Sequence, residues 1–253
     1  MSYVVPIVAV CPMRQQSSHR SEMVSQLLMG EAAVVLESTT DFLKVRSLYD
    51  EYEGWCQRSQ LAVLDELPNN ELSSLLSRDH SNRLLVDGTL MHIGAGTPLG
   101  LLKDQSWGGY TFQYDGNIWD TQNAVFDEKT IHEITKLYLN TPYLWGGRSI
   151  SGIDCSGFSQ QVYRFFGIAL PRDAYQQAAL GESVGFLQET RCGDLAFFDN
   201  EEGKITHVGI LLSSNQIIHA SGQVRIDSID NMGIVHSKTG QRTHALRIIK
   251  RYQ

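Results

Sequence analysis

The first candidate for chemistry in this chain of 253 residues is a cysteine between an acidic residue and a serine. Cys155 follows the glycine-rich stretch YLWGGRSISGID and begins a helical pattern in which Phe158 and Val162 recur at helical spacing. The N–H groups and the dipole at a helix start favour a thiolate. A thiol on an apolar stripe is more often a buried structural cysteine. The polar neighbours Asp154 and Ser156, with the glycines before them, favour a nucleophile instead.

Two histidines downstream could supply the base that a thiol nucleophile needs. His207 and His219 lie in two apolar runs joined by SSN, which predicts a β-hairpin. Side chains alternate along a strand, so a two-residue loop would place the imidazoles on opposite faces of the sheet. A three-residue loop would make His219 face Gly209 and leave His207 as a diagonal neighbour on the same face. We predict the three-residue loop 213–215, with Asn215 in the left-handed region.

The order of these motifs resembles a known enzyme family. PYLWGG, DCSG, RCGDLAFF, HVGI and IIHAS follow one another in the second half of the chain. This half, 124–253, resembles the NlpC-type bacterial cell-wall cysteine peptidases, which have a papain-like fold. The resemblance implies that Cys155 is the nucleophile, His207 the general base and His219 the residue that orients the base. It also implies hydrolysis of the stem-peptide amide of peptidoglycan, commonly between γ-D-glutamate and meso-diaminopimelate or L-lysine.

The same resemblance assigns residues around the reacting atoms. It implies that Tyr143 helps to stabilise the oxyanion. Three residues near the nucleophile would line the substrate pocket: Trp145, Asp154 and Ser156. In relatives with SH3-like domains, the acidic residue of an R-D-x-Y motif holds the free α-amine of the stem peptide's L-alanine, and Asp173 matches it here. The alternative for Asp173 is that it only complements the dipole of the short helix predicted by LPRDAYQQAALG, with Pro171 at its start.

Short predicted strands in the N-terminal half indicate small β-barrels. In 1–64 we expect strands at 4–10, 32–37, 42–46 and 54–57. The stretch GEAAVVLESTTDFLKVRSLYDEYEGWCQRSQL resembles a bacterial SH3-like domain. In 65–123 we expect a second, diverged SH3-like barrel, with strands at 84–87, 89–93, 98–102 and 109–114. A helix capped by Asp127 would open the third domain. The fold expected is therefore α+β, with two SH3-like barrels followed by a papain-like catalytic domain.

The resemblance also suggests that the first SH3-like domain closes one end of the substrate cleft. Tyr52 and Glu22 are the tyrosine and the acid that we expect there, with Glu53 and Glu31 as alternatives for the acid. Such residues in barrel loops are usually just solvated. A closed cleft would restrict the enzyme to substrates with a free amino terminus, whose ammonium group two carboxylates could bind through charge-assisted hydrogen bonds.

Composition limits the partners and the compartment. The net charge of −7 argues against nucleic acid and anionic membranes. The apolar run 4–10 lacks a basic flank and is too short for a membrane span, so we expect no membrane insertion. The four cysteines show no C-x-x-C spacing and the histidines no H-E-x-x-H, so we expect no metal and no cofactor. We expect Cys11, Cys56 and Cys192 to be core residues.

Four functions fit these predictions. We favour a monomeric, cytoplasmic peptidase that trims released murein stem peptides, L-Ala-γ-D-Glu-diamino acid, in peptidoglycan recycling. Reduced thiols and the lack of an evident export signal predict the cytoplasm, and a removed signal would instead mean a secreted or periplasmic protein. The alternatives are a secreted hydrolase of the intact wall, a non-catalytic wall-binding protein, and an acyltransferase on the same scaffold.

Overall fold

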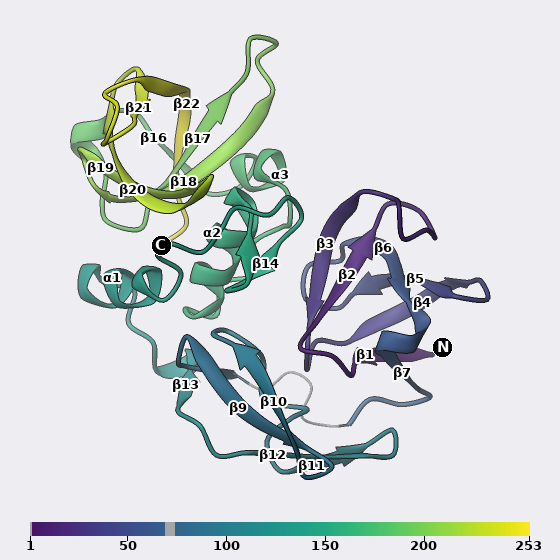
Figure 1. Ribbon diagram of the computed structural model, residues 1–253. Helices are drawn as coiled ribbons and strands as arrows, with labels where there is room; N and C mark the ends of the chain where they lie inside the picture. The colour runs from purple at the N-terminus through teal and green to yellow at the C-terminus, as the bar shows by residue number, and fades with distance from the viewer. Residues whose placement is uncertain (1, 69–73) are drawn as a thin grey trace. The chain divides into compact units, whose positions relative to one another are not determined.

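The chain folds into two compact units in the computed structural model, which describes residues 2–68 and 74–253 (Figure 1). The first unit comprises the residues up to Asn123 together with the segment Trp145–Ser151. The second comprises Ala124–Leu144 and Gly152–Gln253. The predicted domain borders at 64/65 and 123/124 stay predictions. The segment 145–151 lies with the first unit although it was expected within the catalytic domain.

An antiparallel sheet in the first unit runs in the order β3-β2-β6-β5-β4-β1-β7. Its strands and a short 3-10 turn are β1 Tyr3–Pro6, β2 Val10–Arg14, β3 Met23–Leu28, β4 Ala33–Ser38, β5 Phe42–Ser47, β6 Glu53–Gln57, η1 Arg58–Gln60 and β7 Leu61–Leu64. The predicted single strand 4–10 is wrong, because a bend at 7–9 divides it between β1 and β2. Strand β3 was not predicted. Alternating side chains of these strands, such as Val4, Leu27 and Val45, are fully buried in a shared apolar core.

A second group of strands in this unit forms a smaller sheet in the order β10-β9-β12-β11, and β8 pairs separately with β13. The bounds are β8 Leu75–Ser77, β9 Ser81–Val86, β10 Thr89–Gly94, β11 Gln105–Trp107, β12 Tyr110–Tyr114, β13 Ile118–Asp120 and η2 Thr121–Asn123. The predicted strand 98–102 is wrong: Pro98 forms only an isolated bridge with Leu76, residues 100–102 form a turn, and Leu99, Leu101 and Leu102 fill the core.

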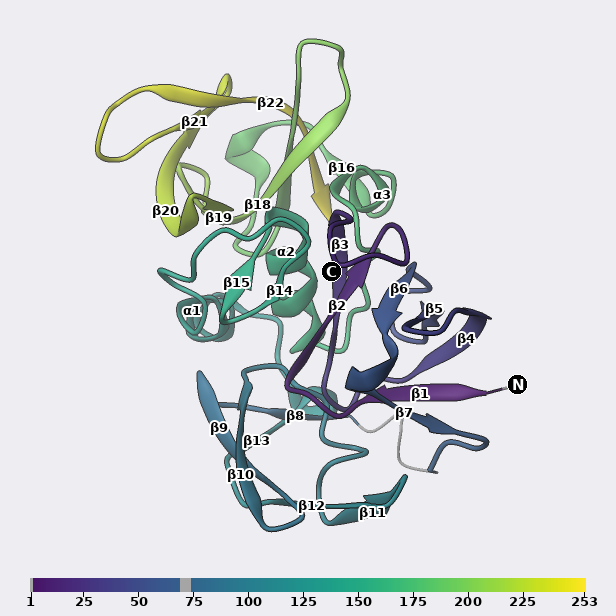
Figure 2. The ribbon, with the colours of Figure 1, turned by 45° about the vertical axis from the view of Figure 1, so that its right-hand side comes forward.

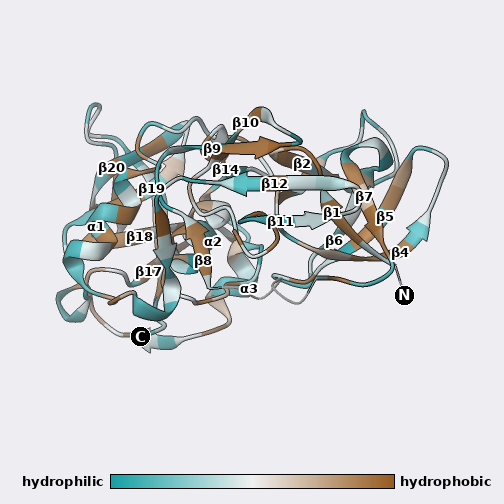
Figure 3. Cartoon of the chain, turned by 90° about the horizontal axis from the view of Figure 1, so that it is seen from below, coloured by the Kyte–Doolittle hydropathy of each residue, from teal (hydrophilic) through white to brown (hydrophobic). Residues whose placement is uncertain are grey.

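One apolar core joins the two groups of strands. Val5 and Met29 from the first group pack in the same cluster as Leu84 and Phe112 from the second. In Figure 3 much of strand β9 has the colour of hydrophobic residues, in keeping with its place at this core. The cluster of Val4, Leu27 and Val45 lies within the first group of strands alone. The number of separate barrels within the unit stays a prediction.

The second unit combines a curved antiparallel sheet with short helices. The sheet order is β16-β22-β17-β18-β19-β20-β21, and a further pairing of β21 with β22 closes the strands into a ring. The helices are α1 Glu128–Lys136, α2 Cys155–Arg164, α3 Ala174–Ala178 and the 3-10 turn η3 Leu187–Glu189. The main strands are β16 Glu182–Val184, β17 Leu195–Asp199, β18 Ile205–Ser213, β19 Gln216–Ser221, β20 Gln223–Asp230, β21 Gly233–Val235 and β22 Arg242–Arg251. Strand β15 Gly152–Ile153 precedes α2, whereas β14 Arg148–Ser149 lies in the segment that belongs to the first unit.

Local signals in the sequence fix where the helices begin. The carboxylate of Asp127 accepts a hydrogen bond from the backbone N–H of Thr130 at 2.8 Å, which confirms the predicted cap of α1. Ile131 and Ile134 give α1 a buried face, and teal and brown alternate around it in Figure 3. Helix α2 packs against β18 and β19, beside which it lies in Figures 1 and 2. In the described part of the chain, none of the helices has the length and apolarity that crossing a membrane requires.

Candidate active site

The predicted nucleophile is the first residue of helix α2. Asp154 has extended backbone and caps the helix, because its Oδ1 accepts a hydrogen bond from the N–H of Gly157 at 2.7 Å. The chain therefore turns from strand β15 into α2 at Cys155, as the DCSG motif predicts. Cys155 is buried at this turn.

The protonation state of Cys155 differs from the thiolate expected from the helix start. The pKa of the Cys155 thiol is raised to about 12, first by burial and then by the nearby Asp154 carboxylate. Hydrogen bonding to the backbone N–H groups of Val208 and Ser156 and the charge of Arg172 lower the pKa by less. The thiol thus keeps its proton at neutral pH and needs a base to become nucleophilic. Helix α2 packs against β18, the strand that contains both Val208 and His207.

The hairpin β18–β19 brings the two histidines to one face by a route that the sequence did not predict. Ser213 pairs with Gln216, so the loop has two residues, and the register shifts between Leu211 and Ser213. This bulge adds one residue to β18, so His207 and His219 lie on the same face of the sheet, where a three-residue loop would also have placed them. The predicted loop 213–215 is wrong, and Asn215 is not among the residues with positive φ.

The prediction that Gly209 faces His219, with His207 on the same face of the sheet, is nevertheless confirmed. A Cβ added to Gly209 would lie 2.9 Å from the Cβ of His219, so these two residues face each other and glycine leaves space for the ring. The imidazoles meet as expected, with 2.8 Å between His207 Nε2 and His219 Nδ1. Burial lowers the pKa of both histidines, and His219 lowers that of His207 further. A neutral His207 imidazole can therefore accept a proton.

Two residues near the histidines were missed by the sequence reasoning. The Nε2 of His219 lies 3.0 Å from Oδ2 of Asp227, a fully buried carboxylate on β20. The ring of His244, on β22, stacks on that of His207 with 4.1 Å between centroids and 23° between planes. Both partners lie on strands that the hairpin motif does not contain. The one sequence signal that could have found Asp227 was the alternation of polar and apolar residues in QVRIDSID, which predicts a strand.

A buried ion pair surrounds the nucleophile. The guanidinium of Arg172 lies 3.0 Å from Oδ1 and 2.5 Å from Oδ2 of Asp154. The same guanidinium donates a hydrogen bond to Oγ of Ser156 at 2.9 Å. Asp154 and Ser156, which were expected to line the substrate pocket, are thus held by Arg172 on either side of Cys155. Sequence reasoning did not single out Arg172, although it precedes Asp173 in the same motif.

Tyr143 lies near the nucleophile and keeps its proton. A parallel β-bridge joins Tyr143 to Ile153, two residues before Cys155. Burial raises the pKa of the Tyr143 hydroxyl, and the negative forms of Cys155 and Asp154 raise it further. A hydroxyl that stays protonated beside the thiol can donate a hydrogen bond to a developing oxyanion.

Asp173 is the N-cap residue of α3 rather than part of a helix that begins at Pro171. The side chain of Gln176 accepts a hydrogen bond from the backbone N–H of Asp173 at 3.1 Å, as in a capping box. This capping arrangement agrees with the helix-dipole alternative. The half-buried carboxylate as a ligand for a substrate amine stays a prediction.

The other predicted substrate residues belong to the first unit. The indole Nε1–H of Trp145, which is 60% exposed, donates a hydrogen bond to Oε1 of Glu22 at 2.6 Å. Tyr52 is half-buried. The alternative Glu31 is wrong as a free acid, because both of its oxygens bind the guanidinium of Arg148 in a buried ion pair. The substrate contacts of Trp145, Glu22 and Tyr52 stay predictions.

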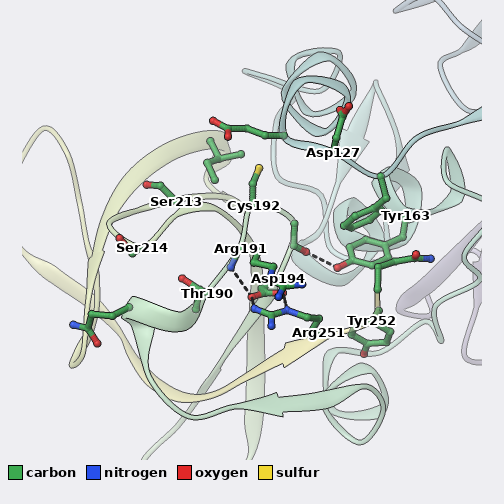
Figure 4. Close-up of a pocket in the computed structure, with 16 residues that line it drawn as sticks. Asp127, Tyr163, Thr190, Arg191, Cys192, Asp194, Ser213, Ser214, Arg251 and Tyr252 are labelled. Atoms are coloured by element: carbon green, nitrogen blue, oxygen red, sulfur yellow. Dashed lines mark hydrogen bonds and ion pairs between the residues drawn. The ribbon is translucent and has the colours of Figure 1, made fainter.

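A separate pocket of the second unit contains the cysteine that was expected in the core (Figure 4). Cys192 is only partly buried and lines this pocket with Asp127 and Tyr163, whereas Cys11 and Cys56 are buried as predicted. An ion pair of Arg251 with Asp194 crosses its wall at 2.7 Å. No cluster of His, Cys, Asp and Glu suited to a metal ion occurs among residues 2–68 and 74–253.

The chain matches known proteins in both halves. Residues 140–243 match the NlpC/P60 family, and residues 13–61 match the bacterial dipeptidyl-peptidase Sh3 domain. A gamma-D-glutamyl-L-lysine dipeptidyl-peptidase of Bacillus cereus is 26% identical over 257 residues, which cover 90% of this chain and 77% of that protein. The protein of the same name from Bacillus subtilis is 45% identical over 85 residues, which cover 33% of this chain and 28% of that protein.

A solved structure has the same fold along the whole chain. The crystal structure of an NlpC/P60 family protein from Bacillus cereus superposes with a TM-score of 0.81 at 20% identity, covering 99% of both chains. The expected α+β architecture, an N-terminal SH3-like domain with a papain-like domain after it, is confirmed.

Proposed function

We propose that this chain hydrolyses the amide between γ-D-glutamate and the diamino acid of murein stem peptides. Residues 140–243 are an NlpC/P60 domain, and the chain is a cysteine peptidase. The observation that carries the proposal is the Cys–His–His arrangement. Helix α2, which begins at Cys155, packs against β18, the strand of His207, and His207 is hydrogen-bonded to His219 at 2.8 Å. The names of the relatives from both Bacillus species support the bond proposed.

The mechanism follows from the protonation states. Neutral His207 removes the proton of the Cys155 thiol as the sulfur attacks the carbonyl carbon, so charge forms only with the new bond. The oxyanion accepts hydrogen bonds from N–H groups at the start of α2 and from the Tyr143 hydroxyl. The imidazolium of His207 then gives its proton to the leaving amine. Water, deprotonated by His207, hydrolyses the thioester and restores the thiol.

We propose that the substrate carries a free N-terminal L-alanine, as in peptides released during peptidoglycan recycling. A dipeptidyl-peptidase removes two residues from a free amino terminus, and the similarity to relatives of that name supports this specificity. Asp173, beside Arg172, would bind the ammonium group, and Glu22 and Tyr52 of the first unit would complete its recognition. The cytoplasmic location predicted for this role stays a prediction.

Mass spectrometry of the products from two synthetic stem peptides tests the proposal. One peptide has a free L-alanine amine and the other is acetylated there, and each is incubated with wild type, Cys155→Ala and the control Cys192→Ala. We expect wild type and Cys192→Ala to cut the free peptide after γ-D-glutamate, and Cys155→Ala to cut neither. Equal cleavage of the acetylated peptide would refute the free-amine requirement and favour action on intact wall. Activity of Cys155→Ala would refute the nucleophile. An added amine acceptor that appears in the product would indicate an acyltransferase.

A further inference from the structure

Asp227, a buried carboxylate next to the orienting histidine, accepts hydrogen bonds from three residues. Oδ2 of Asp227 lies 3.0 Å from Nε2 of His219 and 2.9 Å from Nε of Arg225. Oδ1 of Asp227 accepts a hydrogen bond from the backbone N–H of Ser237 at 2.9 Å. The side chain of Asp227 is completely buried.

The register of the sheet places this carboxylate where it can act on His219. In the ladder of β19 with β20, His219 is paired with Arg225 and Ile217 with Asp227. His219 and Asp227 are therefore diagonal neighbours on one face of the sheet, the same relation that joins His207 and His219 across β18 and β19. The result is a line of hydrogen bonds across three adjacent strands, from His207 through His219 to Asp227.

The direction of each hydrogen bond in this line follows from the charge of Asp227. Burial opposes the carboxylate's charge, but the hydrogen bonds from His219, Ser237 and Arg225 hold the pKa of Asp227 far below its usual range. An ionised carboxylate only accepts hydrogen bonds, so Nε2 of His219 must carry a hydrogen.

The tautomers of both histidines are then determined. Burial lowers the pKa of His219, and its neutral ring has one N–H, already used toward Asp227. Its Nδ1 therefore accepts, and Nε2 of His207 must donate across the 2.8 Å separation. Neutral His207 then has its lone pair on Nδ1. This is the protonation pattern that a general base needs, with the other nitrogen engaged in a hydrogen bond.

We propose that Asp227 is a positioning residue of the catalytic centre, which sets the tautomers of His219 and His207 so that Nδ1 of His207 is free to take the Cys155 proton. The inference rests on the proposed function only for its kinetic readout. The arrangement of His219 and His207 toward each other can be measured without any substrate.

The alternative is that Asp227 only stabilises the sheet by pairing with Arg225 and binding the backbone at Ser237. Such a role would change the stability of the protein without moving a hydrogen between imidazole nitrogens. Other groups also act on His219, since Arg225 and His236 lower its pKa and the ring of His244 lies 5.7 Å away. The test therefore measures tautomers directly rather than a titration alone.

The first measurement is imidazole nitrogen NMR of the full-length protein labelled with ¹⁵N-histidine. We expect wild-type His219 and His207 both as Nε2–H tautomers at pH 7.5. The signals are assigned by loss of each one in His219→Gln and His207→Gln. Wild-type His219 as the Nδ1–H tautomer would overturn the proposal without any variant of Asp227.

The second measurement uses Asp227→Asn, in which one acceptor becomes an N–H donor. With the amide NH₂ toward His219, Nε2 of His219 must accept, its Nδ1–H points at His207, and the hydrogen of His207 moves to Nδ1 and blocks the base. We expect the tautomer signals to change and kcat to fall by roughly 10²-fold or more, with KM little changed. Asp227→Glu, which keeps a carboxylate, is expected to recover part of kcat and the wild-type tautomers.

Asp230→Asn is the matched control. Asp230 lies on the same strand, binds Arg242 at 2.7 Å and has a lowered pKa, caused first by that hydrogen bond, but the described contacts do not connect it to His219. We expect its kcat to match wild type. A normal kcat for Asp227→Asn, or a reduced kcat with unchanged tautomers, would overturn the proposal. Cleavage by Cys155→Ala would instead refute the proposed function and leave the tautomer result standing.

Discussion

The buried ion pair of Glu31 with Arg148 should be among the most sensitive contacts of the first unit. Each partner side chain is 1% exposed, and two hydrogen bonds of 3.0 Å join the guanidinium to the carboxylate. Arg148 also donates to the backbone oxygen of Gln26 at 2.7 Å, and its guanidinium lies over the ring of Tyr49. Glu31 accepts a further bond from the backbone N–H of Leu28 at 2.8 Å. The segment 145–151 is thus attached to the first unit by charge.

Removing one partner should cost much more than removing both. Glu31→Ala removes the carboxylate that two 3.0 Å hydrogen bonds of the buried Arg148 guanidinium reach, and breaking a buried ion pair by removing one partner costs about 3–5 kcal/mol. For a unit of this size, such a loss lowers the midpoint of thermal unfolding by roughly 10 °C or more. The pair Glu31→Leu with Arg148→Met removes both charges, and apolar replacements of a buried ion pair are often neutral. We expect this double variant to recover most of the lost stability.

Tryptophan fluorescence during urea unfolding measures this effect selectively. All four tryptophans, at positions 55, 107, 119 and 145, belong to the first unit. Glu37→Gln, which breaks the exposed pair of Glu37 with Lys44, is the control and should leave the midpoint unchanged. A small effect of Glu31→Ala, or a double variant less stable than the single one, would refute the reasoning.

Three further predictions concern the second unit. Tyr143→Phe should lower kcat by about 10²-fold if its hydroxyl binds the oxyanion, and steady-state kinetics with an unchanged kcat would contradict that role. Because the pKa of Cys155 is raised to about 12, its thiolate fraction at pH 7 is about 10⁻⁵. The rate of carboxamidomethylation of Cys155, measured by mass spectrometry with Cys155→Ala as the control, should rise about tenfold per pH unit from pH 7 to 10. A rate that does not change with pH in this range would instead indicate a thiolate paired with imidazolium. The pKa values of His207 and His219 are lowered in the folded state, so the unfolded chain binds more protons than the folded one below about pH 6.5. The free energy of unfolding should therefore have its full value above that pH and fall as the pH decreases. Calorimetry that finds the same melting temperature at pH 7.5 and 5 would refute this.

The local chemistry of the catalytic centre could be predicted from the sequence because short-range rules control it. A carboxylate before an apolar helical pattern caps a helix, so Asp154 places Cys155 at the first turn. Alternation along strands limited His207 and His219 to two arrangements, and the chemistry of a thiol nucleophile selected the correct one. The strands of the first sheet were predicted where hydrophobic alternation was regular, as in β5 and β6.

Errors arose where an apolar run has more than one way to be buried. Leu99, Leu101 and Leu102 have the hydrophobicity of a buried strand, yet they fill the core from backbone that belongs to no strand. The bulge between Leu211 and Ser213 placed His207 and His219 on one face, as predicted, although the loop is shorter than predicted. One added residue moves the following side chains to the other face of a strand whether it lies in the loop or in the strand.

The sequence by itself was enough to predict the candidate reacting side chains Cys155, His207 and His219, with Tyr143 as a candidate for the oxyanion. Only the tertiary structure decided which groups support them. Asp227 lies beside His219 because of the register of β20. In the first unit, likewise, Arg148 pairs with Glu31, which is 117 positions away in the chain. Capping and strand alternation act over a few neighbouring residues and leave a pattern that can be read. A buried charge finds its partner through the packing of distant segments, and a single sequence carries no local sign of that partner.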